Sequence, residues 1–287
     1  MNIEKIDLHM HTKASDGTDT PAELLQRIHK AGITVFAVTD HDTIDGGLKI
    51  IEHMQKDDPA FILGVEFSCK DERGKYHILG YGFDPEKPLI RELLDFCHSS
   101  RIGRVQRRIA FLEREYGFTF SKEDLDKLYS CDNPGKPHIG NLMVMYGYTE
   151  NKEDAILNYI NKYKESEKRI RPERAIQAIE DAGGIPVLAH PTFGSGEERI
   201  EGDEMEERII RLKSYGLKGL EAYYSGFTKE MRDELLSFAE KYDLYVTAGS
   251  DYHGTNKPVR LGETHLDEDY PQGLIRFLKD VRVRKGE

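Results

Sequence analysis

Residue types that bind metals or transfer protons recur at the ends of predicted strands. His9 and His11 are two residues apart in an alternating strand pattern, so both imidazoles point to the same side. Asp251 and His253 repeat this spacing after the last predicted strand. The other candidate ligands, each at or near a strand end, are Asp16, His41, Glu66, His77 and His190. Imidazole and carboxylate are common ligands of divalent transition metals.

Taken singly, these residues have ordinary structural explanations. A lone histidine in a strand is usually a hydrogen-bonded core residue, and a lone Asp-Gly is usually a turn. In a barrel, however, the carboxyl ends of the strands converge on one mouth, so all the candidates become neighbours. Crowded imidazoles and carboxylates would repel one another or lack partners unless a cation lay between them. The pattern therefore predicts a cluster of divalent metal ions.

An alternation of strands and helices positions these segments. The first helix is marked by Thr20 as N-cap, by Pro21 and Glu23, and by Gly32 after its end. Strands are predicted at 6–10, 33–38, 60–65, 76–82, 185–189, 219–223 and 244–248, and helices at 21–31, 45–56, 172–182, 203–215 and 228–241. Seven strands with helical crossovers favour a parallel α/β barrel over an open sheet.

The middle of the chain departs from this alternation. Its apolar residues follow helical spacing almost throughout, as in Leu89, Leu93 and Leu94, and no strand pattern is evident. We therefore predict a barrel in two parts, residues 1–88 and 171–287, interrupted by an α-helical insertion domain at 89–170.

Composition narrows the class of protein. Lys and Arg number 41 and Asp and Glu 52 among 287 residues, so the net charge of −11 argues against a protein that coats nucleic acid. No apolar run approaches the roughly 18 residues of a membrane span. Three scattered cysteines favour a reducing compartment over a disulfide framework. A strand pattern from Ile6 leaves little room for a signal peptide, so a cytoplasmic location is expected.

The motifs resemble those of the PHP (polymerase and histidinol phosphatase) family along the whole barrel. They are Asp7-Leu-His-Met-His11, Ser15-Asp-Gly17, Thr39-Asp-His41, Glu66, His77, Ala189-His-Pro191 and Ser250-Asp-Tyr-His-Gly254. The resemblance implies an α/β fold, a distorted (β/α)7 barrel with three divalent metal ions. The strands counted above agree with this fold independently.

The resemblance also implies which residues hold each ion. One ion would take His9, His11, Glu66 and Asp251; a second would take Asp16, His41 and His253; a third would take His77 and His190, with Glu66 as a bridge. Mixed imidazole and carboxylate ligands suit Mn²⁺, Fe²⁺ or Zn²⁺. The nucleophile would be a metal-bridging hydroxide, with Glu66 and Asp251 as supporting ligands.

The insertion resembles one PHP subgroup, the stand-alone enzymes that act on nucleoside 3′,5′-bisphosphates and on the 5′ ends of short RNAs. Lys136 and His138 match its Gly-Arg-Pro-His segment, although Lys136 stands where arginine is usual and offers no bidentate fork. Arg104, in a helical run of arginines, and Lys257, shortly after His253, are further candidate phosphate contacts. Each could equally be an ordinary solvated cation.

These observations predict a metal-dependent phosphoesterase that hydrolyses a nucleotide phosphate ester. Expected substrates are a nucleoside 3′,5′-bisphosphate such as pAp and short single-stranded RNA degraded from its 5′ end, with no obligate protein partner. One alternative is a PHP phosphatase for another small phosphomonoester such as histidinol phosphate. Another is a non-catalytic regulatory PHP module, which would require missing ligands, whereas all nine ligand positions carry suitable residues.

Overall fold

A computed structural model describes residues 5–131, 134–164, 169–193, 199–267 and 269–286. The chain divides into two compact units. The first comprises Met1–Leu93 and Arg169–Glu287, and the second comprises Leu94–Lys168. Among the described residues, none of the helices combines the length and apolar character needed to cross a bilayer.

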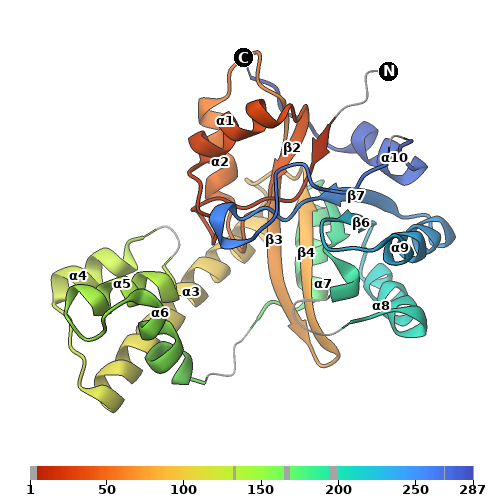
Figure 1. Ribbon diagram of the computed structural model, residues 1–287. Helices are drawn as coiled ribbons and strands as arrows, with labels where there is room; N and C mark the ends of the chain where they lie inside the picture. The colour runs from red at the N-terminus through yellow and green to blue at the C-terminus, as the bar shows by residue number, and fades with distance from the viewer. Residues whose placement is uncertain (1–4, 132–133, 165–168, 194–198, 268, 287) are drawn as a thin grey trace. The chain divides into compact units, whose positions relative to one another are not determined.

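Seven strands form one sheet in the first unit, in the order of the sequence (Figure 1). They are β1 (Ile6–Asp7), β2 (Val35–Val38), β3 (Ala60–Asp71), β4 (Gly74–Tyr81), β5 (Ile185–Leu188), β6 (Gly219–Tyr224) and β7 (Tyr245–Gly249). The two edges of the curled sheet meet. The Leu8 amide donates to the Ala248 carbonyl at 2.9 Å, and Met10 forms a parallel bridge with Tyr252. The result is a nearly closed barrel, as predicted.

The expectation of an entirely parallel barrel is wrong at β4. This strand is antiparallel to both β3 and β5. The physical reason is the turn at Glu72 and Arg73, which joins Asp71 directly to Gly74, since a two-residue turn can connect only antiparallel strands. β3 also continues to Asp71, beyond the predicted end at 65, and forms a long hairpin with β4.

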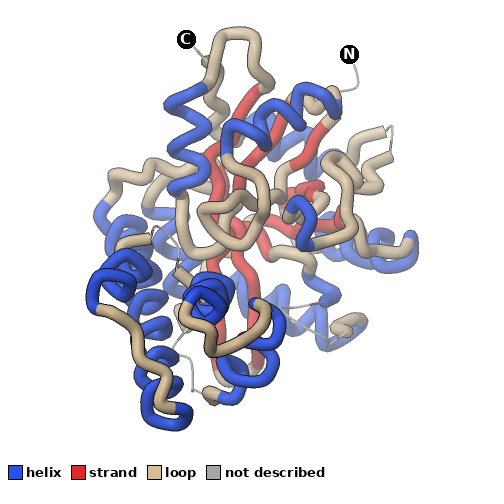
Figure 2. Tube along the Cα trace, turned by 60° about the vertical axis from the view of Figure 1, so that its left-hand side comes forward, coloured by secondary structure: helices blue, strands red, loops and turns tan. Residues whose placement is uncertain are grey.

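Helices cover the outside of the barrel. They are α1 (Pro21–Ala31), α2 (Asp45–His53), α7 (Pro172–Asp181), α8 (Gly202–Ser214), α9 (Lys229–Lys241) and α10 (Gln272–Asp280). The short 3₁₀ segments Pro191–Phe193 and Gly254–Asn256 follow β5 and β7. In α1 the predicted capping box forms, and Gly32 adopts a left-handed conformation at the end of the helix. Figure 2 shows the strands as red tubes beside the blue helices.

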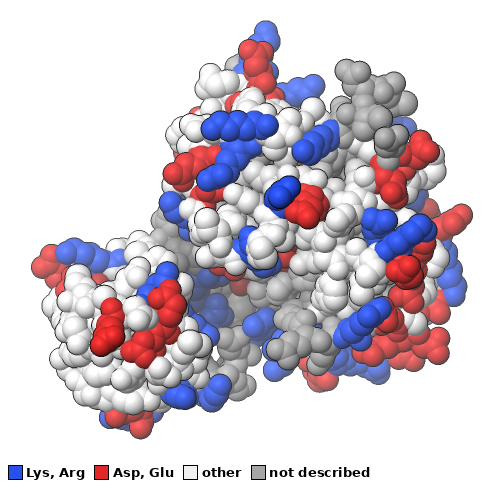
Figure 3. Space-filling view, in the orientation of Figure 1, with Lys and Arg blue, Asp and Glu red and all other residues white. Residues whose placement is uncertain are grey.

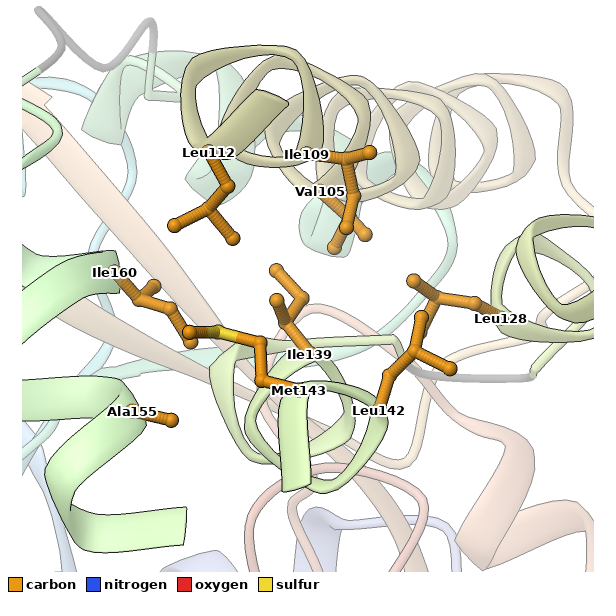
Figure 4. Packing of buried hydrophobic residues seen from close by; sticks show 9 residues of the cluster. All are labelled: Val105, Ile109, Leu112, Leu128, Ile139, Leu142, Met143, Ala155 and Ile160. Atoms are coloured by element: carbon orange, nitrogen blue, oxygen red, sulfur yellow. The ribbon is translucent and has the colours of Figure 1, made fainter. Parts of the chain in front are cut away.

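The second unit is helical in its described residues, which agrees with the helical spacing of the sequence. It contains most of α3 (Pro88–Tyr116), then α4 (Lys122–Tyr129), α5 (Lys136–Met145), α6 (Lys152–Asp154), a π-helical turn (Ala155–Tyr159) and a 3₁₀ turn (Ile160–Lys162). Leu112 from α3 and Met143 from α5 point toward one another in a small apolar core (Figure 4). This unit therefore has a core of its own.

Candidate metal centre

Glu66 on β3 lies at the centre of the predicted ligands. Its side chain is 1% exposed, and its two oxygens face different imidazoles. Oε2 lies 3.3 Å from Nε2 of His9 and 3.3 Å from Nε2 of His11. Oε1 lies 2.8 Å from Nδ1 of His77 and 3.0 Å from Nε2 of His190. One carboxylate oxygen thus faces the imidazoles that follow β1, and the other faces His77 on β4 and His190 after β5.

Asp251 approaches the same histidines from the end of β7. Its Oδ1 lies 3.3 Å from Nε2 of His11 and 3.5 Å from Nε2 of His9. Its Oδ2 accepts hydrogen bonds from the Tyr224 hydroxyl at 2.9 Å and from the Lys257 ammonium at 2.6 Å. Asp251 has a φ of 58°, a left-handed conformation that is uncommon for residues with a Cβ.

Asp16 lies at the outer side of the cluster, with a side chain that is 57% exposed. Its Oδ1 is 3.2 Å from Nε2 of His253, and its Oδ2 is 3.9 Å from Nε2 of His41. The other ring nitrogen of His41, Nδ1, lies 3.0 Å from Oε2 of Glu66. His41 therefore lies between the exposed carboxylate and the buried one.

Among the described residues, three groups of side chains have ligand atoms close enough together to share a metal ion. They are His11, Asp16, His41 and His253; His9, His11 and Asp251; and His41, Glu66 and His77. All nine predicted ligands thus belong to one of these groups or, as with His190, contact Glu66 directly.

The chemistry of the donor atoms fits a cation. Nε2 of His9, Nε2 of His11 and Oε2 of Glu66 are buried, and none of them has a hydrogen-bond partner. These three atoms nevertheless lie beside one another, at the distances given above. Buried polar atoms without partners are costly, and a divalent ion between them would remove that cost. The residues present therefore fit a metal site.

The electrostatics of the cluster point the same way. Burial opposes a charge on His11, but the adjacent carboxylates of Asp251 and Glu66 raise its pKa to about 9. Burial, together with the nearby imidazoles of His11 and His77, lowers the pKa of His41 to about 3. Burial also opposes ionisation of Glu66, yet the surrounding imidazoles hold its pKa well below the usual range. The cluster favours its carboxylates charged and so attracts positive charge.

Two further acidic residues hold the loops that carry ligands. Asp40 accepts hydrogen bonds from the Thr12 amide at 2.8 Å and from the Ser15 hydroxyl at 2.5 Å. These bonds fix the segment that contains His11 and Asp16. Asp7 likewise accepts from the Ser250 amide at 2.9 Å, next to Asp251. Both carboxyls stand in the quoted motifs, but no local pattern indicates that they hold neighbouring segments in place.

Glu221 is a buried residue that sequence reasoning missed. It lies on β6, its side chain is fully buried, and its Oε1 is 2.8 Å from Nδ1 of His9. Its Oε2 accepts the backbone N–H of His190 at 2.7 Å. The segment 219–223 was predicted as a strand, and a single acidic residue within an apolar strand gave no metal-ligand spacing to detect.

The predicted substrate contacts lie in both units. Lys257, in the first unit, pairs with Asp251. Lys136 begins α5 in the second unit, and its ammonium donates to Oδ1 of Asn161 at 2.7 Å. His138 accepts the Gly135 amide at its Nδ1 at 3.3 Å, and burial lowers its pKa. Arg104 is half-buried on α3.

The aromatic residues near the ligand-bearing strand ends pack mainly against neighbouring side chains. The rings of Tyr224 and Phe193 lie 5.0 and 5.5 Å from that of Phe227, measured between centroids. The hydroxyl of Tyr223 donates to Asp267, and that of Tyr252 donates to Asp19. These four aromatic residues therefore belong to the packing around the barrel mouth.

The nearly closed barrel and the imidazole–carboxylate cluster at its strand ends are those of a metal-dependent hydrolase. The PHP domain family matches residues 7–170. The chain is 30% identical to a 5′-3′ exoribonuclease of Haemophilus influenzae over 91% of its own length and 94% of the relative. It is 28% identical to a 3′,5′-nucleoside bisphosphate phosphatase of Chromobacterium violaceum over 98% of both chains.

A solved structure agrees with these sequence matches. It is the crystal structure of a protein from Bifidobacterium adolescentis assigned to the metal-dependent phosphoesterases, with a TM-score of 0.76, 31% identity and 96% of both chains covered. This chain belongs to the PHP family. It is a phosphoesterase, a hydrolase that acts on phosphoric ester bonds, as the motifs predicted.

Proposed function

We propose that this chain hydrolyses the phosphate monoester of a nucleoside 3′,5′-bisphosphate such as pAp, and that short single-stranded RNA degraded from its 5′ end is a second substrate. The observation that carries the proposal is the position of the Glu66 carboxylate. Its Oε2 lies beside buried ring nitrogens of His9 and His11 that have no hydrogen-bond partner among the described residues, and its Oε1 contacts the imidazoles of His77 and His190. The substrate class is supported by the two relatives, one named as a bisphosphate phosphatase and one as an exoribonuclease.

Three divalent ions, Mn²⁺, Fe²⁺ or Zn²⁺, are part of the proposal. His9, His11, Glu66 and Asp251 would hold the first ion, with Glu66 shared with a second ion at His77 and His190. Asp16, His41 and His253 would hold the third. When bound, such ions neutralise phosphoryl oxygens and lower the pKa of water to near neutrality.

The protein's own residues would orient these ligands and recognise the substrate. Lys257 and Tyr224 fix one oxygen of Asp251, which leaves the other facing His9 and His11. Acidic and basic side chains are mixed over the face seen in Figure 3. We assign phosphate recognition to the four predicted contacts, Lys136, His138, Arg104 and Lys257.

A location in the cytoplasm belongs to the same proposal. Cys69 and Cys97 are buried free thiols, and Cys131 is a free thiol that is partly exposed. Free cysteines are typical of reducing compartments.

A substrate panel on protein of defined metal content tests the proposal. Phosphate release would be measured from pAp, from histidinol phosphate and from a simple aryl phosphate, and nucleotide release from a short RNA with a 5′ phosphate. We expect the highest kcat/KM for pAp, with measurable activity on the RNA. A preference for histidinol phosphate over pAp would contradict the substrate assignment. Absence of hydrolysis with all four compounds at full metal occupancy would support a regulatory module instead.

A further inference from the structure

Glu221 contacts two proposed metal ligands, His9 in the segment after β1 and His190 in the segment after β5. Its Oε1 lies 2.8 Å from the ring nitrogen Nδ1 of His9, and its Oε2 lies 2.7 Å from the backbone nitrogen of His190. Both carboxylate oxygens are therefore used as acceptors. The side chain is fully buried, so water does not compete for either bond.

The first contact determines which nitrogen of His9 can bind a cation. A carboxylate can only accept, so Nδ1 of His9 must carry the proton in this hydrogen bond. The opposite nitrogen, Nε2, lies 3.3 Å from Oε2 of Glu66 and 3.5 Å from Oδ1 of Asp251. Its lone pair is thereby directed into the gap between those two carboxylates. Metal-binding histidines commonly have such a carboxylate on the opposite ring nitrogen.

The second contact stabilises an uncommon backbone conformation. His190 has a φ of 28°, outside the regions that side chains with a Cβ usually adopt. The hydrogen bond from its N–H to Glu221 helps to hold this conformation, in which Nε2 of His190 reaches Oε1 of Glu66 at 3.0 Å. Glu221 therefore acts on both sides of the Glu66 carboxylate.

Gly249 on β7 shows how little space surrounds this arrangement. A Cβ at this position would lie 2.2 Å from Cβ of His9 and 2.5 Å from Oε1 of Glu221. Both atoms belong to the hydrogen-bonded pair itself. The absence of a side chain at Gly249 is what allows His9 and Glu221 to meet.

We propose that Glu221 is a positioning residue for the metal centre: it fixes the ring of His9 and the backbone of His190, and so couples the two ion sites on either side of Glu66. This inference rests on the proposed function, because it assumes that these histidines bind metal. In this role Glu221 would act through His9 and His190 and would not itself be a ligand.

The variant Glu221→Gln tests this role because an amide cannot accept a hydrogen bond at both contacts. If its oxygen accepts from the N–H of His190, its NH₂ group faces Nδ1 of His9 and pairs with it only when the ring proton lies on Nε2, the nitrogen proposed to bind metal. We expect Mn²⁺ affinity, measured by competition with a chelator, to fall about 10- to 100-fold. Asp71→Asn is the matched control, since Asp71 is a carboxylate with 3% exposure that pairs with Arg211 and Tyr76 on the β3–β4 hairpin. Its Mn²⁺ affinity should equal that of the wild type.

A measurement on the wild-type protein covers the case in which Glu221→Gln does not fold. In protein loaded with Zn²⁺ and labelled with ¹⁵N-histidine, the imidazole signals assigned to His9 should show a proton on Nδ1. A proton on Nε2 would overturn the inference.

The outcomes also separate this inference from the proposed function. Unchanged Mn²⁺ affinity in Glu221→Gln, with a wild type that binds metal and hydrolyses pAp, would overturn the role of Glu221 alone. A wild type that binds no Mn²⁺ would overturn both. A loss confined to Glu221→Gln, together with the Nδ1 proton on His9, supports the role of Glu221.

Discussion

Oε1 of Glu66 lies 2.8 Å from Nδ1 of His77, and it is the opposite oxygen, Oε2, that faces His9 and His11. A single buried side chain thus reaches two sets of ligands that come from different strands. This geometry suits a bridging carboxylate between two ions, the role that the family resemblance assigns to Glu66.

Replacing Glu66 should affect more than one metal ion. In Glu66→Ala both carboxylate oxygens are lost, so metal occupancy should fall by more than one site and kcat/KM should fall by several orders of magnitude. Metal analysis of the purified protein and steady-state kinetics check this expectation. Near-normal turnover, or the loss of a single ion, would refute the bridging assignment.

Gly249→Ala should weaken metal binding without replacing a ligand. The added methyl group would collide with His9 and Glu221, so we expect lower Mn²⁺ affinity in a chelator competition assay. Gly103→Ala on α3 is the matched control, because its nearest neighbour is the flexible end of Arg107, 3.0 Å away. The control should keep its Mn²⁺ affinity and gain up to about 1 kcal/mol of stability from helix propensity. Equal affinities in the two variants would contradict this account.

Lys136→Ala should distinguish substrates with a second phosphate from those without one. If Lys136 contacts that phosphate, kcat/KM for pAp should fall about 10-fold or more, from the loss of a charged hydrogen bond. Hydrolysis of an aryl phosphate should stay nearly unaffected, which makes it the internal control. Similar losses on both substrates would point to a folding role, through the contact of Lys136 with Asn161.

Leu112→Ala should destabilise the second unit selectively. Leu112 is fully buried in that unit's own core, so the substitution should cost about 2–5 kcal/mol. Hydrogen exchange, followed by mass spectrometry, should show faster exchange in α4 and α5 with little change in β2 and β7. A uniform increase across both units would show that they unfold together.

Removal of metal should lower the stability of the barrel. A ligand that binds only the folded state raises the free energy of unfolding by about 2.7 kcal/mol at a concentration of 100 Kd. This contribution disappears when a chelator removes the metal. We therefore expect a lower Tm in EDTA, restored by added Mn²⁺, with a much smaller response in Glu66→Ala. Identical melting curves with and without metal would speak against a bound ion.

The sequence predicted much of the barrel because strand ends carry chemically distinctive residues. His9 and His11 could be placed on one face by their spacing, and the fold contains a two-residue turn at Glu72 and Arg73. The antiparallel direction of β4 was missed, although that turn requires it. The side-chain contacts that could not be predicted depend on tertiary structure. One example is the pairing of Lys257 with Asp251, a residue that itself adopts a left-handed backbone conformation.

Glu221 is a second residue whose contacts could not be predicted from the sequence. Its partners, His9 and His190, are 212 and 31 residues away in the chain. Local spacing contains no information on such contacts. Only the closure of the sheet, which brings β6 beside β5 and β7 and joins β7 to the segment after β1, places the carboxylate between them.

Anomalous diffraction from crystals grown with Mn²⁺ tests the metal centre most directly. The account predicts anomalous peaks on both sides of the Glu66 carboxylate, one beside His9, His11 and Asp251 and another beside His77 and His190. A map without anomalous density there, in which the imidazoles turn away from Glu66, would contradict it.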